Sequence, residues 1–137
     1  MINELIFGIV IAWVLANIIK AIINWIKEKK ISHRVFIYDG GMPSSHTVSV
    51  AALSAGIYLE TGFSILFIMS VVITLIVIND ALKVRWITEE QSRAINKLTQ
   101  GKKGFKKMSE HVGHRPVEVF VGLLIGIIVP IIVYAII

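Results

Sequence analysis

The 137-residue chain contains no cysteine, only three prolines and few charged residues. Without cysteine, the protein has no disulfide bond, no thiol nucleophile and no cysteine-ligated zinc site. Charged residues make up 17% of the chain and hydrophobic residues 55%, and the mean hydropathy is +0.78. Since a water-soluble protein of this length could not bury so much apolar surface, the composition indicates a single membrane domain over residues 1–137.

Four long apolar stretches account for the high hydropathy. A helix that spans a membrane needs about 20 mostly apolar residues, and about 17 are tolerated. We therefore predict an all-α integral membrane protein, a four-transmembrane-helix bundle with helices at about residues 2–26, 44–60, 62–85 and 116–137. Residues 88–98 have the pattern of an amphipathic helix, which we expect as a cytoplasmic segment between the third and fourth helices. The alternative is two spans and one buried soluble hairpin.

Basic residues are absent from the link between the second and third apolar stretches and from the chain after Arg115. Thirteen of the fourteen Lys and Arg residues lie in the segments 27–34 and 83–115. The positive-inside rule therefore predicts a bacterial inner or plasma membrane protein with both basic segments in the cytoplasm and both termini outside. The lysine runs are suited to anionic headgroups of the lipid bilayer. No basic module interleaved with aromatic residues is present, so we expect no nucleic-acid partner.

Two histidine motifs occur where a polar loop enters an apolar helix: GGMPSSHT at 40–47 and EHVGHRPVE at 110–118. Helix starts carry unpaired N–H groups and a positive dipole end, which attract anions. His114 and Glu118 are four residues apart and share a helix face. A carboxylate bonded to one imidazole nitrogen fixes the tautomer and leaves the other nitrogen free to attack. His46 can hold an anion or protonate a leaving oxygen.

Polar side chains also occur inside the predicted membrane helices, at the end where the two motifs lie. Lys20 is in the first helix, where an ionisable group costs roughly 3 kcal/mol or more unless it is paired or reaches the headgroups. Asp80 and Arg85 stand at the end of the third helix. The alternatives to a functional role are that Lys20 extends to the headgroups and that Asp80 and Arg85 form a local ion pair.

A metal site is the rival chemistry for the same residues. His111 and His114, together with Asp80 or Glu118, include the ligand types that bind zinc. The spacing of three between the histidines suits one helix face less well than a spacing of four, and Pro116 disfavours regular helix just before it. We therefore predict no metal and no cofactor.

The two motifs resemble signatures of the type 2 phosphatidic acid phosphatase (PAP2) superfamily. The motif at 40–47 looks like the second signature, Pro-Ser-Gly-His, with Ser45 in place of glycine. Residues 114–118 are similar to the end of the third signature, His-x-x-x-Asp, with Glu118 in place of aspartate. With the paired glycines and the Asp80–Arg85 pair, almost the whole chain resembles the small divergent branch of that superfamily, which is related to acid phosphatases and vanadium-dependent haloperoxidases. The further residues that support this resemblance are Gly40, Gly41 and Asp80.

The resemblance implies a mechanism and roles for individual residues. His114 would attack phosphorus to give a phosphohistidine, Glu118 would orient it, and His46 would protonate the leaving alkoxide. Met108 stands where the third signature has an arginine, so other groups would have to bind the phosphate. Those candidates are Ser44, Ser45, Lys20, Lys27, Arg34, Arg85 and Arg115, of which Lys27 and Arg34 match the spacing of the first signature, with Val35 in place of its proline.

The sequence thus predicts a membrane lipid-phosphate phosphatase that acts at the cytoplasmic interface. The alternative is a non-catalytic protein that binds or transports a phospholipid or polyprenyl phosphate, and a vanadate-dependent oxidant is a distant third. The expected partners are a membrane lipid phosphate and the bilayer. Gly122 and Gly126 form a Gly-x-x-x-Gly pair, which suits close helix packing either in a homodimer or within one chain.

Overall fold

The computed structural model describes residues 2–28, 41–102, 104–110 and 112–137, and these contain helices and no strand. The predicted all-α class is therefore confirmed for the part of the chain that is described. Along the sequence, the helices are α1 (Ile2–Glu28), α2 (Ser45–Thr61), α3 (Ile65–Asn79), the π-helix η2 (Asp80–Val84), α4 (Arg85–Thr99) and α5 (Pro116–Ile136).

Helix α2 lies at the centre of the bundle and packs against α1, α3 and α5. Its middle is rich in small residues, so the neighbouring backbones can approach closely. The core that results consists of small side chains from α1 and α2: Ala12, Ala16, Val48 and Ala52. A polar pair ties α2 to α3, because the Ser54 and Thr74 hydroxyls are 2.9 Å apart and Thr74 also donates to the Val50 carbonyl at 3.1 Å.

The two glycines of the Gly-x-x-x-Gly pair lie where α5 crosses α2. A Cβ atom on Gly126 would lie 2.6 Å from the Val48 carbonyl oxygen, and one on Gly122 would lie 2.9 Å from the Ser44 carbonyl oxygen. Real Cβ atoms do not approach backbone this closely, so only glycine fits at either position. The pair is thus used within one chain, to hold α5 against the start of α2.

Three helices are long and apolar enough to cross a membrane: Ile2–Ile26, Ile65–Thr99 (which includes α3, η2 and α4) and Pro116–Ile136. Their outer faces expose many large apolar side chains, including Ile68, Leu75 and Ile131. Such surfaces are suited to contact with lipid and are unfavourable in water. Helix α2 is shorter, with 17 residues, and packs between the other helices of the bundle.

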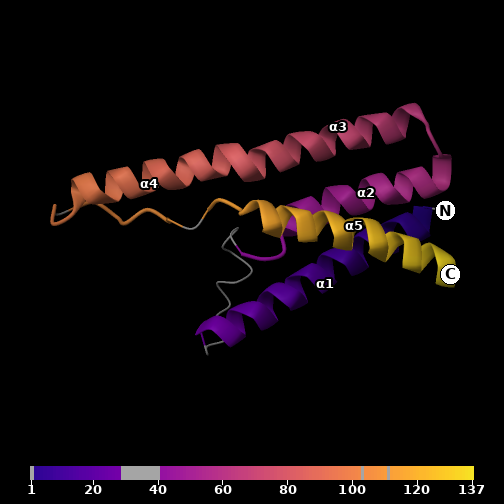
Figure 1. Cartoon of the computed structure of the whole chain (residues 1–137), viewed down its shortest axis with the longest axis horizontal. Helices are drawn as coiled ribbons and strands as arrows, with labels where there is room; N and C mark the ends of the chain where they lie inside the picture. The colour runs from indigo at the N-terminus through magenta and orange to yellow at the C-terminus, as the bar shows by residue number, and fades with distance from the viewer. Residues whose placement is uncertain (1, 29–40, 103, 111) are drawn as a thin grey trace.

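Helices α3, η2 and α4 form one continuous rod whose α4 end extends beyond the bundle (Figure 1). The amphipathic helix expected at 88–98 is therefore a direct extension of the third apolar helix. After α4 the chain turns and runs back beside the rod to the start of α5 (Figure 1). The start of α1, the end of α5 and the α2–α3 turn lie at the opposite end of the molecule from α4.

Candidate functional site

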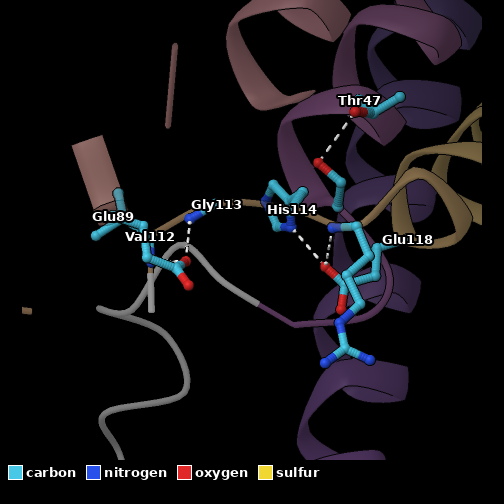
Figure 2. A network of polar contacts seen from close by, with 8 residues as sticks. Thr47, Glu89, Val112, Gly113, His114 and Glu118 are labelled. Atoms are coloured by element: carbon cyan, nitrogen blue, oxygen red, sulfur yellow. Dashed lines mark hydrogen bonds and ion pairs between the residues drawn. The ribbon is translucent and has the colours of Figure 1, made fainter. Parts of the chain in front are cut away.

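The first turn of α5 holds His114 and Glu118 together. Pro116 occupies the first helical position, where its fixed φ is favourable and its missing N–H is not needed. The Glu118 carboxylate accepts a hydrogen bond from the Arg115 backbone N–H at 3.1 Å, and Nδ1 of His114 lies 3.1 Å from the same oxygen (Figure 2). A carboxylate only accepts, so Nδ1 carries the proton and Nε2 keeps a lone pair when the ring is neutral.

The second ring nitrogen of His114 is buried and unpartnered. The residue is 5% exposed, and Nε2 has no hydrogen-bond partner within the described ranges. An unsatisfied buried polar atom is costly, and such atoms are rare in folded proteins. A histidine that is oriented through Nδ1 and unpaired at Nε2 is arranged for a nucleophile, a base or a ligand contact.

The two histidine motifs, about 70 residues apart in sequence, meet through Ser44. Its backbone N–H donates to the Glu118 carbonyl at 3.1 Å, and its hydroxyl oxygen accepts from the Thr47 hydroxyl at 3.0 Å (Figure 2). Ser44 is fully buried, so it joins the start of α2 to the start of α5. Ser45 and His46 follow in the first turn of α2, where the His46 side chain is exposed.

The backbone that leads into His114 is held against the rod. The His114 N–H donates to the Ala81 carbonyl of η2 at 3.3 Å. One carboxylate oxygen of Glu89, on α4, accepts from the backbone N–H groups of Val112 and Gly113, at 3.3 and 3.1 Å (Figure 2). A Cβ atom on Gly113 would lie 3.1 Å from Cα of Trp86, so a glycine suits this close approach. A π-helical turn at this contact is notable, because such turns are frequent at functional sites.

Glu89 is a residue that the sequence did not indicate. It lies four residues before Arg93, and the two side chains form an ion pair, which is the usual pattern of a solvent-exposed helix face. Its second role is to accept hydrogen bonds from two backbone amides, which lie 23 and 24 residues later in the chain. The only signal in the sequence was its place on an amphipathic helix that precedes the motif.

Two predicted cations lie beside the site in different ways. Lys20 of α1 is 3% exposed, and a Cβ atom on Gly41 would lie 3.5 Å from its Cε, so Lys20 packs against the turn that leads into α2. Arg85 follows η2 on the rod, between Ala81 and Glu89, which both bond to the segment before α5. Its Nε donates to Asp80 at 2.9 Å, so the local ion pair that the sequence left as the alternative to a functional role is formed.

The structure gives less information on the other residues that the sequence predicted for the site. Arg115 is the exposed N-cap residue of α5. Lys27 is in the last turn of α1, but its side chain lies outside the described residues, as do Arg34, Gly40 and His111. Within the described ranges, no three His, Asp or Glu side chains form a group that could hold a metal.

Met108, at the position of the usual third-signature arginine, is held far from His114. The Asn96 side chain donates to the Met108 carbonyl and accepts from its N–H, at 2.9 and 2.8 Å. Asn96 is fifteen residues beyond Ala81, which contacts His114, so at 1.5 Å per helical residue the two sites are about 20 Å apart. A cation that binds phosphate at His114 must therefore come from elsewhere, and the described candidates are Lys20, Arg85 and Arg115.

Sequence comparison found known proteins that this chain resembles. The chain is similar to YuiD, an uncharacterized membrane protein of Bacillus subtilis (strain 168), with 38% identity over a 134-residue alignment that covers 85% of each chain. No solved structure matches. The relative and the exposed apolar helices together identify an integral membrane protein. The family model for the divergent PAP2 family matches residues 1–129, which include both histidine motifs. This chain is therefore a member of the divergent PAP2 family.

Proposed function

We propose that the protein is a lipid-phosphate phosphatase that hydrolyses a phosphomonoester at the cytoplasmic membrane interface without a metal. The observation that carries this proposal is the state of the His114 ring, which is oriented by Glu118 through Nδ1 and whose buried Nε2 has no partner among the residues that the structure describes. A residue with only a structural role would gain stability by pairing that nitrogen. A nucleophile needs it unpaired until substrate arrives.

In the proposed first step, Nε2 of His114 attacks phosphorus and the bond from phosphorus to the ester oxygen breaks. His46, at the start of α2, donates a proton to the leaving alkoxide, which departs as an alcohol. The ring is then a phosphohistidine, whose positive charge the Glu118 carboxylate stabilises. In the second step His46 takes a proton from water, the water oxygen attacks phosphorus, and inorganic phosphate leaves with the histidine restored.

Charge on the phosphoryl oxygens needs cations that are already in position, because electrostatic stabilisation is the main contribution to phosphoryl transfer. Lys20 and Arg85 are our choice for this role. Lys20 is buried beside the turn before α2. Arg85 is on the rod, four residues after Ala81, whose carbonyl accepts from the His114 N–H. The backbone amides at the start of α2, with Ser45, would add donors.

The membrane supplies the rest of the proposed substrate. The bundle exposes apolar faces along α1, α3 and α5, and the histidine motifs lie at one end of those helices. An amphiphile in the bilayer would therefore keep its tail against the helices and bring its phosphate to the site. The basic segments, which we expect on the cytoplasmic side, assign the site to that face.

The test is the release of inorganic phosphate by purified protein in detergent, without added metal, from phosphatidate, phosphatidylglycerophosphate and polyprenyl phosphates. We expect release by the unaltered protein and none by His114→Ala. Circular dichroism and gel filtration would show that the variant is folded. Equal release by folded His114→Ala would refute the assignment of the nucleophile.

A second candidate is a non-catalytic lipid-phosphate binding or transport protein. It is favoured by the position of Met108, since the family position for one phosphate-binding arginine holds an uncharged residue about 20 Å from His114. A binder needs the anion site but no nucleophile. It predicts that His114→Ala still binds phosphatidate in a vesicle assay and that neither protein releases phosphate from any substrate in the panel.

A further inference from the structure

A second polar feature lies at the far end of the rod. The segment that returns from α4 and that helix line an open cavity of about 510 Å³. One wall is the second half of α4, with Arg93, Asn96 and Lys97, and the other is the returning segment, with Lys102, Lys107 and Glu110. Its volume is within the range of small-molecule sites, but its lining is polar, which suits a charged ligand. Figure 1 shows the two walls side by side, well away from the bundle.

The charges around this cavity are unbalanced. Arg93 is paired with Glu89, and the Glu110 carboxylate accepts a hydrogen bond from Asn96 at 2.6 Å. The three lysines, Lys97, Lys102 and Lys107, have no carboxylate partner within the described ranges. Three cations that share one space with a single carboxylate repel each other, and an anion between them would relieve that repulsion.

The cavity is distinct from the site at His114. Lys97 is seventeen residues beyond Asp80, where the apolar part of the rod ends, so it lies about 25 Å farther along. Lipid headgroups at the end of α3 would not reach that far if the rod stands upright in the membrane. A ligand dissolved in water would reach the cavity.

We propose that this cavity binds a phosphate-bearing anion and thereby fastens the returning segment to α4. Lysine ammonium groups on both walls supply charge-assisted hydrogen bonds to phosphate oxygens, with Lys97 on α4 and Lys107 on the returning segment. The cavity holds more than one phosphate group, so a di- or polyphosphorylated small molecule fits it best. This proposal does not depend on hydrolysis at His114.

The test uses the full chain as His114→Ala in phosphatidylcholine nanodiscs, with inorganic pyrophosphate as the probe. Amide hydrogen exchange in peptides that cover 97–110 is followed as pyrophosphate is added, so the readout is local to the cavity. We expect slower exchange on saturation. The pyrophosphate concentration for half effect should rise about tenfold in Lys97→Gln and in Lys107→Gln, since each removes a charged donor.

Lys106→Gln is the matched control, because Lys106 is the exposed neighbour of Lys107 and does not line the cavity. We expect its half-effect concentration to stay within about twofold of the parent. A second arm replaces pyrophosphate with nanodiscs that contain phosphatidate, and protection only in that arm would assign the anion to a lipid headgroup. No protection in either arm would overturn the proposal, as would equal weakening by Lys106→Gln and Lys107→Gln.

Discussion

The Glu118 carboxylate accepts two hydrogen bonds within one turn of α5, one from the helix start and one from His114. It therefore fixes both the backbone and the ring. We expect Glu118→Ala to lower kcat for phosphate release by about 10²–10⁴-fold, because the imidazole loses its orientation and the carboxylate that stabilises its cation. Glu118→Gln keeps an acceptor oxygen, so its kcat should fall less. A wild-type kcat in Glu118→Ala would contradict this role.

Glu89 acts one step farther from the chemistry, through the amides of Val112 and Gly113. Removing its carboxylate in Glu89→Ala leaves those amides unpaired and lets the segment before His114 move. We expect kcat to fall roughly 10- to 100-fold, since small displacements of a nucleophile are costly. Hydrogen exchange of the same two amides should become faster, whether or not the protein is active.

The control for Glu89 is its neighbour Glu90, which is exposed and has no hydrogen bond to the described residues of that segment. Glu90→Ala should leave both the rate and the exchange unchanged. Glu89→Gln retains one acceptor oxygen, so it should restore part of the rate and part of the protection from hydrogen exchange. The positioning role would be wrong if Glu89→Ala and Glu90→Ala behaved alike.

At the residue scale, the sequence predicted the local pairs and missed the distant ones. The contact His114–Glu118 follows from a spacing of four residues, which is readable without a fold, whereas Asp80 and Arg85 are five residues apart and meet at the π-turn Asp80–Val84. The contact of Glu89 with Gly113 depends on how the chain turns after α4, and no periodicity encodes that turn. The same holds for Ser44, which the sequence offered as a phosphate contact and which the structure uses to join α2 to α5.

At the scale of the elements, the crossing of α5 over α2 controls the site, because Ser44 and Glu118 lie next to it. A methyl group at Gly126 would lie 2.6 Å from both the Val48 carbonyl and Ala51 Cβ. We expect Gly126→Ala to reduce the free energy of unfolding by roughly 1–3 kcal/mol, as overpacking does. Thermal unfolding in detergent would measure it.

Gly8 of α1 provides a matched control for that substitution. A Cβ atom there would lie 3.4 Å from Cβ of Pro130, which is an ordinary contact distance. Gly8→Ala should be neutral or stabilising by up to about 1 kcal/mol, since alanine favours a helix over glycine. If Gly126→Ala were no less stable than Gly8→Ala, the close crossing of α2 and α5 would be wrong.

The elements themselves were the most predictable part of the fold. Long apolar runs indicate helices because a buried or lipid-exposed backbone must satisfy its own hydrogen bonds. The π-turn at Asp80–Val84 and the continuity of α3 with α4 were not predictable. The Ala81 carbonyl inside this turn accepts from the His114 N–H, a contact between residues that are distant in sequence and that local patterns do not reveal.

At the scale of the whole molecule, the α2–α3 turn lies at the opposite end from α4 and the returning segment (Figure 1). Because the chain has no cysteine, single cysteines can be introduced without background labelling. In intact bacterial cells, a membrane-impermeant maleimide should label Phe63→Cys, in the α2–α3 turn, and fail to label Lys106→Cys until the cells are opened. The reverse pattern would contradict the predicted sidedness.

The central claim is that His114 carries the phosphoryl group, and a covalent intermediate tests it most directly. Purified protein would be mixed with lipid phosphate labelled with ³²P, quenched in alkali because phosphohistidine is acid-labile, and mapped by mass spectrometry. We predict a label on His114 of the unaltered protein that is absent from His114→Ala. Phosphate release with no label on His114, or a label that remains in His114→Ala, would contradict the account.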